Sequence, residues 1–179
     1  PSWRPDGTQI AYESNQTGNW DIWVTQVSGG RSVNLTADYP GEDRFPSLSP
    51  DGSQIAFFSG REGGGYFVMS ALGGKPRKVA AQVFRKHGPP QWSSDGRRLA
   101  YVAGSGLSDW PAEIVSLERG SSHRVALPGP EGSPAWHLSW SPNGLFFAYS
   151  IAWDEWTPIS PIWVMRLTDG KGFPVTEGE

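Results

Sequence analysis

The chain has 179 residues and a formal net charge of −3, and it contains no cysteine. Charged residues of both signs are spread along it, so there is no basic footprint for nucleic acid and no polybasic segment for a membrane surface. No apolar run approaches the roughly 18 residues that a membrane-spanning helix needs.

A turn signature occurs four times along the chain, at Trp3-Arg4-Pro5-Asp6-Gly7, Leu48-Ser49-Pro50-Asp51-Gly52, Trp92-Ser93-Ser94-Asp95-Gly96 and Trp140-Ser141-Pro142-Asn143-Gly144. Residues 5, 50, 94 and 142 are 45, 44 and 48 residues apart. Proline fixes φ, Asp or Asn caps its own turn and Gly accepts a positive φ, which together favour a tight reversal between two strands.

The same strands follow each signature in chain order. The first has Ala at one register in all four copies, in the segments Gln9-Ile10-Ala11-Tyr12, Gln54-Ile55-Ala56-Phe57, Arg98-Leu99-Ala100-Tyr101 and Phe146-Phe147-Ala148-Tyr149. The second begins near residues 22, 66, 114 and 162 and ends at a glycine-bearing turn, and a short apolar strand follows it. Each repeat is therefore predicted to contain four strands.

Four strands in about 44 residues is the size of one β-propeller blade. The sequence predicts an all-β fold, a segment of four consecutive four-stranded antiparallel blades with almost no helix. The approximate blade boundaries are 1–41, 42–84, 85–132 and 133–179, in a single array. Trp3, Leu48, Trp92 and Trp140 share one slot, and we expect them to fill the space between blades.

The first signature begins at residue 3, so most of the strand that precedes it in the other copies is missing. The chain therefore looks like a piece of a longer one. An incomplete ring exposes sheet edges that invite pairing. We expect either further blades or association between copies.

The Pro-Asp-Gly turn, the Ile-Ala-Tyr or Ile-Ala-Phe strand after it, and the Ile-Trp-Val strand at residues 22–24 and 162–164 resemble the repeat of the TolB-like six-bladed propeller family. The resemblance covers essentially the whole chain. The third copy departs from it, because Ser94 replaces proline and no aromatic residue stands at the position of Trp23, which we align with Ile114.

The resemblance implies a range of functions. Such propellers occur in a periplasmic protein that binds peptidoglycan-associated lipoprotein, in extracytoplasmic sensor regions of larger bacterial proteins, and as the gating propeller of prolyl-oligopeptidase-like serine peptidases. Because one fold hosts many functions, residues that do not repeat must discriminate among these.

The unusual residues lie in loops that propellers gather on one face, where we expect a protein partner or a small ligand to bind. Exposed Trp beside charge is typical of a binding hot spot, although such a Trp can instead fold back over its own blade. An internal ion pair is the alternative for Glu42, Asp43 and Arg44. The candidate binding residues are Tyr39, Arg44, Arg85, His87, Trp110, His137, Trp153, Asp154 and Trp156.

The sequence offers little for catalysis or for a metal. There is no Gly-x-Ser-x-Gly, no His-Glu-x-x-His and no Cys, so nucleophilic and zinc-hydrolase schemes lack their parts. His87 and His137 lie on separate blades without the spacing of a metal motif. We predict no catalytic residue, no metal and no cofactor.

The sequence thus favours a non-catalytic binding scaffold, the docking or sensor region of a larger bacterial protein. The alternative is the gating propeller of a serine peptidase whose catalytic domain lies outside this chain. The resemblance and the absence of cysteine favour a periplasmic or other extracytoplasmic location. Nucleic acid is not expected as a partner, and self-association through open blade edges remains an option.

Overall fold

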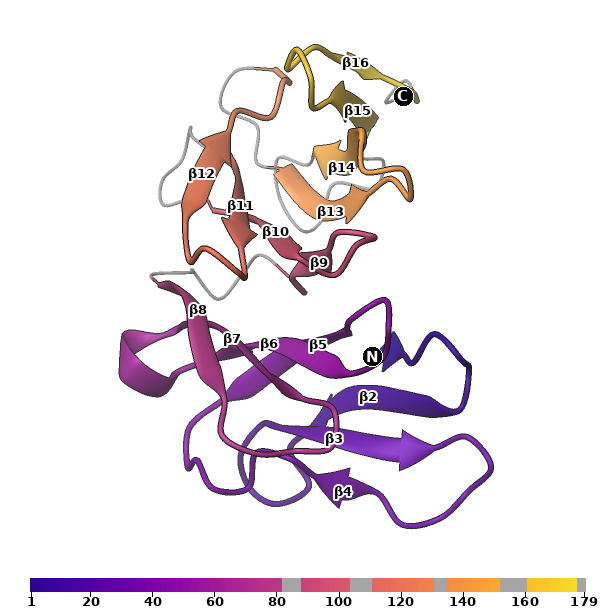
Figure 1. Ribbon diagram of the computed structural model, residues 1–179, viewed down its shortest axis with the longest axis vertical. Coiled ribbons are helices and arrows are strands. Elements are labelled where there is room, and N and C mark those ends of the chain that lie inside the picture. The colour runs from indigo at the N-terminus through magenta and orange to yellow at the C-terminus, as the bar shows by residue number, and fades with distance from the viewer. Residues whose placement is uncertain (82–87, 104–110, 131–134, 152–160, 177–179) are drawn as a thin grey trace. The chain divides into compact units, whose positions relative to one another are not determined.

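The computed structural model describes residues 1–81, 88–103, 111–130, 135–151 and 161–176. The chain divides into two units, Pro1–Arg85 and Lys86–Glu179, each with two sheets (Figure 1). Every sheet has four antiparallel strands in chain order. The predicted all-β fold of four antiparallel four-stranded sheets is confirmed.

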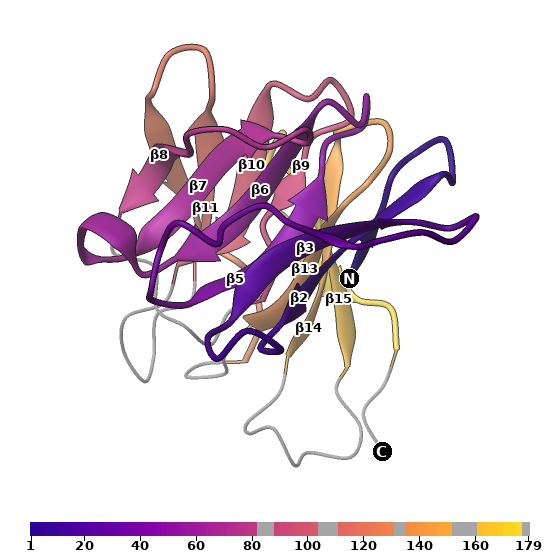
Figure 2. The same ribbon diagram turned by 90° about the horizontal axis from the view of Figure 1, so that it is seen from below.

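In the first unit, sheet 1 is formed by β1 (Ser2–Trp3), β2 (Gln9–Ser14), β3 (Asp21–Gln26) and β4 (Val33–Asn34). Sheet 2 is formed by β5 (Asp43–Leu48), β6 (Gln54–Ser59), β7 (Gly65–Ser70) and β8 (Arg77–Ala81). A single-turn 3₁₀ helix, Arg61–Gly63, connects β6 to β7 (Figure 2).

In the second unit, sheet 3 is formed by β9 (Gln91–Trp92), β10 (Arg98–Val102), β11 (Ala112–Ser116) and β12 (Ser122–Val125). Sheet 4 is formed by β13 (Ala135–Trp140), β14 (Phe146–Ile151), β15 (Ile162–Arg166) and β16 (Gly172–Pro174).

The four signature turns share one hydrogen-bonding scheme. In the second turn, the Gly52 amide donates to the Ser49 carbonyl at 2.8 Å, and Asp51 Oδ1 accepts the Ser53 amide at 3.0 Å. Gly52 has φ +70°, which an L residue adopts only with strain. The third turn keeps this geometry although Ser94 replaces proline, because the Asp95 side chain accepts the Arg97 amide at 3.0 Å. The side-chain cap and the glycine therefore suffice for the turn.

The core of the first unit lies between sheets 1 and 2. Sheet 2 places Leu48 and Ile55 against a face of sheet 1 that carries Ala11, Ile22 and Val24. Apolar residues at alternate positions of each strand face this layer, as the period of two requires.

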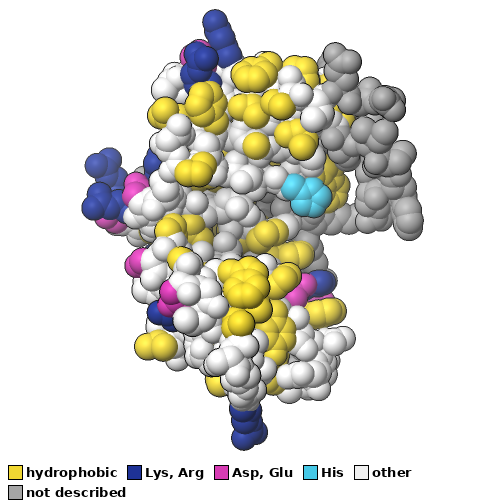
Figure 3. All heavy atoms as spheres, turned by 90° about the vertical axis from the view of Figure 1, so that its right-hand side faces the viewer, with side chains coloured by type: hydrophobic (Ala, Val, Ile, Leu, Met, Phe, Trp, Pro, Cys, Tyr) yellow, Lys and Arg dark blue, Asp and Glu magenta, His cyan; other side chains and the backbone are white. Residues whose placement is uncertain are grey.

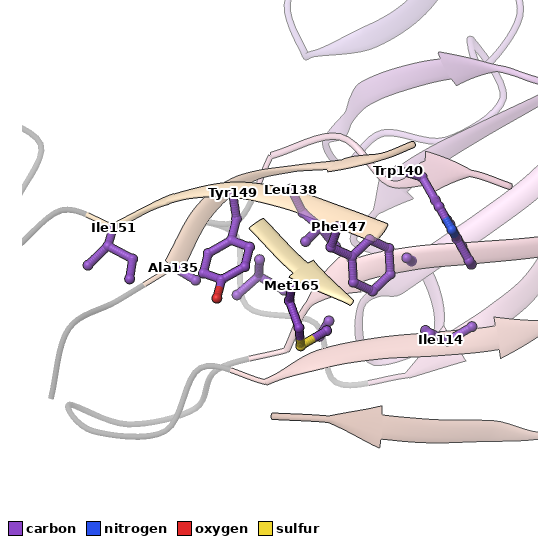
Figure 4. Packing of buried hydrophobic residues seen from close by; sticks show 11 residues of the cluster. Ile114, Ala135, Leu138, Trp140, Phe147, Tyr149, Ile151 and Met165 are labelled. Atoms are coloured by element: carbon purple, nitrogen blue, oxygen red, sulfur yellow. The ribbon is translucent and has the colours of Figure 1, made fainter. Parts of the chain in front are cut away.

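The second unit repeats this layer between sheets 3 and 4. Trp140, Phe147 and Met165 of sheet 4 pack on Ala100 and Ile114 of sheet 3. Figure 4 shows Trp140, Phe147 and Met165 of sheet 4 together with Ile114 of sheet 3. The rings of Trp140 and Phe147 meet edge to face, with centroids 4.9 Å apart.

The prediction that the slot residues fill inter-blade space is correct for Leu48 and Trp140 and wrong for Trp3. Leu48 and Trp140 are buried in the two inter-sheet clusters, whereas Trp3 is 59% exposed. Trp92 is buried as well. Leu48 is covered because it packs on the sheet before it, and the described residues place no sheet before β1.

The register corrects one alignment of the third repeat. Ala100 pairs with Ile114, as Ala11 pairs with Val24, so Ile114 corresponds to Val24. Glu113 therefore occupies the position of Trp23. Strand pairing fixes this correspondence, and similar apolar runs in the sequence cannot.

The first strands of sheets 2 and 4 carry a bulge at the same place. Pairing with the second strand shifts between Arg44 and Ser47 in one case, and between Trp136 and Ser139 in the other. Inside each bulge lies a non-glycine residue with positive φ, Phe45 at +57° and His137 at +50°. Strained positions such as these are uncommon and often accompany binding sites.

Candidate functional site

The loops of the first unit meet at one end of its sheets. Asn19, just before β3, donates from Nδ2 to the carbonyl oxygens of Tyr39 and Gly41 at 3.1 and 3.0 Å. The Asp43 amide donates to the Trp20 carbonyl at 2.7 Å. The connection between β2 and β3 is thereby tied to the connection between sheets 1 and 2.

Arg44 lies at this end within an arginine–aromatic cluster, which we define as Glu13, Trp20, Arg44 and Phe45. The guanidinium carbon lies 4.4 Å from the Trp20 ring centroid and 5.2 Å from that of Phe45. Its Nη2 donates to Glu13 Oε1 at 3.0 Å. Glu13 Oε2 also accepts the Phe45 amide at 2.6 Å, which steadies the bulge. Arg44 is thus held in place by a carboxylate and two rings while about a third of its side chain remains exposed.

Asp43 and Arg61 form a second, more buried group beside it. Arg61 Nη2 donates to Asp43 Oδ2 at 2.8 Å, and the guanidinium lies 4.7 Å from the Tyr39 ring centroid. The Asp43 side chain is fully buried. Burial raises the pKa of its carboxyl group, and the hydrogen bond from Arg61 opposes that rise.

Ion pairs do stabilise this turn, with partners that the sequence did not identify. Asp43 pairs with Arg61 from the 3₁₀ helix that follows β6, and Arg44 pairs with Glu13 from sheet 1. Three neighbours of Tyr39 and Arg44 were not predicted from the sequence, namely Glu13, Trp20 and Arg61. Trp20 alone carried a signal, as an aromatic residue at a loop end. The two pairings depend on which strands lie side by side.

Asp21 is a further carboxylate at this end, and both of its oxygens accept hydrogen bonds. It accepts hydrogen bonds from Thr17 Oγ1 at 2.8 Å, Asn19 Nδ2 at 2.9 Å and Asn34 Nδ2 at 2.6 Å. Three donors satisfy a buried carboxylate without a cation. Asp21 therefore fastens the loop and is not free to bind a ligand.

In the second unit, His137 is the one described member of the predicted set. Its side chain is exposed, and Nδ1 lies 3.2 Å from Ser150 Oγ. It occupies in sheet 4 the bulge position that Phe45 occupies in sheet 2. Arg85, His87, Trp110, Trp153, Asp154 and Trp156 lie outside the described residues.

The described parts of the chain contain no group of three or more His, Cys, Asp or Glu side chains arranged to hold a metal ion. They also contain no helix of the length and apolarity that crossing a membrane requires.

Two curated proteins that resemble the chain in sequence are named as peptidases. The "Uncharacterized peptidase YuxL" of Bacillus subtilis is 32% identical over 139 residues, which is 72% of this chain and 20% of the relative. "Dipeptidyl-peptidase 5" of Porphyromonas gingivalis is 33% identical over 117 residues, which is 57% of this chain and 17% of the relative. The chain thus spans about a fifth of the length of the curated relatives it matches.

Solved structures of TolB resemble the fold. A putative TolB from Agrobacterium tumefaciens matches 99% of this chain and 61% of its own, with a TM-score of 0.77 at 19% identity. TolB from Acinetobacter baumannii matches 100% of this chain and 43% of its own, with a TM-score of 0.72 at 24% identity.

The sequence model of the TolB beta propeller domain matches residues 1–176. Together with the four sheets and their repeated turns, this match shows that the chain belongs to the family of TolB beta propeller domains.

Proposed function

We propose that the chain is a non-catalytic propeller segment that binds peptide for a larger peptidase-type protein. The observation that carries the proposal is that both curated relatives, at 32 and 33% identity, are named as peptidases. The chain spans only about a fifth of each, so the residues that cut the peptide would lie outside it. Its own sequence has no Gly-x-Ser-x-Gly motif.

The arginine–aromatic cluster supports this proposal chemically. A guanidinium in contact with two rings presents a planar cation beside apolar surface, which suits a peptide carboxylate next to an apolar side chain. Arg44 Nη2 already donates to Glu13, so only part of the guanidinium group is left to bind a ligand. We therefore expect Arg44 to contribute one of several weak contacts that the loops make with the peptide.

The remaining described candidates belong to separate units. Tyr39, in the first unit, contributes an aromatic ring beside the Arg61 guanidinium. His137, in the second unit, contributes an exposed imidazole to the surface of that unit. The candidates outside the described residues stay in the proposal on the strength of their sequence alone.

Peptide binding is tested with the isolated chain and a pool of fluorescein-labelled tryptic casein peptides. Saturable binding without any cleavage supports the proposal, and we expect Arg44→Ala and Trp20→Ala to weaken it about three- to tenfold. Arg97→Ala is the matched control, since Arg97 is an exposed arginine paired with Glu118 at 3.4 Å, outside the loop end. Cleavage by the isolated chain, or the absence of saturable binding, contradicts the proposal.

A docking or sensor scaffold is the second candidate, and the same loops would serve it. It predicts that the full-length protein captures a folded partner and does not hydrolyse peptides. Peptidase assays of the full-length protein decide between the two, because only the first candidate predicts turnover there.

We also propose an extracytoplasmic location for the whole protein, which rests on the family and on the lack of cysteine. Fusion of β-lactamase to the full-length protein tests it. Ampicillin resistance is expected, and sensitivity contradicts the assignment.

A further inference from the structure

Two arginines at the loop end of the first unit differ in how many of their guanidinium nitrogens have a partner. All three nitrogens of Arg61 donate to side chains, Nε to Ser59 at 3.1 Å, Nη1 to Asp38 at 3.3 Å and Nη2 to Asp43 at 2.8 Å. In Arg44, by contrast, Nη2 is the one nitrogen that donates to a described residue, and its buried Nε has no partner there. Arg44 therefore keeps a hydrogen-bonding capacity that Arg61 lacks.

Glu13 is an incomplete partner for Arg44. Its Oε1 accepts from Arg44 Nη2 at 3.0 Å, whereas its Oε2 accepts the Phe45 amide at 2.6 Å. Phe45 lies in the bulge of β5 with φ +57°, so the second bond holds a strained residue in place. Glu13 thus offers Arg44 a single oxygen. A free carboxylate offers a guanidinium two oxygens, and this paired contact is the stronger one.

The charges of Glu13 and Arg44 cancel, so the pair does not attract an anion from a distance. Figure 3 shows acidic and basic side chains next to one another on the face of the first unit that it presents, so that face is not of a single sign. A ligand carboxylate therefore gains at Arg44 through direct contact, in competition with Glu13.

We propose that Glu13 is an internal competitor at Arg44, and that the peptide group bound there is a carboxylate, from a C-terminus or from an Asp or Glu side chain. This inference rests on the proposed function, because it concerns the peptide that the chain binds. The incoming carboxylate accepts from Nη1 and Nη2 together and displaces Glu13 Oε1. Glu13 Oε2 keeps the Phe45 amide, so the bulge is retained while Arg44 changes partner.

Three dansyl-labelled peptides that differ only in their carboxylates test this inference by fluorescence anisotropy with the chain. Dansyl is chosen because it carries no carboxylate of its own. The first peptide is Gly-Gly-Gln-Leu-Phe with a free C-terminus, the second is its C-terminal amide, and the third is that amide with Glu in place of Gln. We expect the wild-type chain to bind the first, the third or both about threefold more tightly than the second. Which of them is preferred identifies the source of the carboxylate.

Glu13→Gln shows whether Glu13 competes. The amide oxygen of the new side chain can still accept the Phe45 amide, but the side chain has no charge to pair with Arg44. We expect this variant to bind the preferred carboxylate peptide about three- to fivefold more tightly than the wild type, and the amide peptide equally. A merely structural role for Glu13 predicts the opposite sign, a weaker binding of all three peptides.

Two further variants complete the set. Arg44→Gln is expected to bind the three peptides equally, because it removes the cation that distinguishes them. Glu118→Gln is the matched control, since it removes the carboxylate of the exposed Arg97 pair in the second unit, and we expect it to bind like the wild type. Circular dichroism checks that each variant is folded.

The outcomes separate this inference from the proposed function. Unchanged or weaker binding of the carboxylate peptides by Glu13→Gln overturns the inference, and so does a preference for carboxylates that survives in Arg44→Gln. Equal, saturable binding of all three peptides by the wild type overturns the inference and leaves peptide binding intact. Absence of saturable binding of all three also overturns it, and the casein peptides then show whether the proposed function fails as well.

Discussion

Arg61 and Arg97 are expected to contribute differently to the free energy of unfolding, because their carboxylate partners differ in burial. Arg61 neutralises Asp43, whose side chain has no solvent exposure, and it lies against the ring of Tyr39. Arg97 pairs with Glu118 in solvent, where both side chains are more than half exposed. Exposed pairs contribute little, whereas removal of one partner from a buried pair leaves an uncompensated charge.

We therefore expect Arg61→Met to lower the free energy of unfolding by about 3–5 kcal/mol at neutral pH, measured by urea denaturation. Burial raises the pKa of Asp43 even with Arg61 present, and loss of Arg61 raises it further. The deficit should shrink as the pH falls through that pKa, because the protonated carboxyl is cheaper to bury. Arg97→Ala is the control and should change stability by less than about 0.5 kcal/mol. Equal effects of the two variants would contradict the assigned role of Arg61.

Asp51, the aspartate of the second signature turn, has a lowered pKa, whereas the pKa of Asp43 is raised. Hydrogen bonds from Ser49 Oγ and from the amide and hydroxyl of Ser53 lower the pKa of Asp51 to about 2. This group stabilises the fold above its unfolded pKa of 3.8, and the contribution is lost as the pH falls through the folded value. Asn143 accepts the equivalent amide, from Leu145 at 3.1 Å, without a titratable group.

Asp51→Asn should therefore retain most of the stability at pH 7 and flatten the acid limb of the stability curve. The measurement is thermal unfolding at a series of pH values from about 7 down to about 1, a range that includes the unfolded pKa of 3.8 and the folded pKa of about 2. A variant whose acid limb keeps the wild-type slope would show that the Asp51 carboxylate contributes nothing through its charge.

At the scale of the element, the last residue of each first strand is buried or exposed according to the neighbours of that strand. Trp140 packs between sheets 3 and 4, and Arg98 lies 4.9 Å from its ring centroid. Trp3 occupies the same slot in sheet 1 and remains mostly exposed. The same residue type at the same repeat position thus has opposite surroundings.

Trp140→Ala should lower the free energy of unfolding by about 3–5 kcal/mol, because it removes a buried aromatic side chain and leaves a cavity. Trp3→Ala is the matched comparison and should cost less than about 1 kcal/mol when measured at a concentration at which the chain is monomeric. A large loss with Trp3→Ala under those conditions would show that Trp3 is a core residue.

At the scale of the whole molecule, the two hydrophobic clusters belong to separate units. One cluster draws its residues from sheets 1 and 2, and the other draws them from sheets 3 and 4. In repeat proteins, stability is approximately a sum over repeats and their nearest neighbours. A defect in one cluster should therefore be felt mainly in its own unit.

Amide hydrogen exchange checks this expectation. In Trp140→Ala, exchange should accelerate in peptides from residues 88–176 and change little in peptides from residues 1–81, and Arg61→Met should show the reverse pattern. Uniform acceleration across both units in either variant would mean that they unfold as one cooperative body.

The sequence by itself determined the repeat, because turn chemistry and the period-two strand pattern are local properties. Pro-Asp-Gly turns and the Ala register predicted four units of four strands, and the described sheets have that composition. Only the tertiary structure decided which residues meet. Arg61 with Asp43, Glu13 with Arg44, the bulges at Phe45 and His137, and the exposure of Trp3 all depend on which strands and sheets are neighbours. Partners from separate strands or sheets leave no signal in the local sequence, because strand pairing and sheet packing, which bring them together, act across the fold.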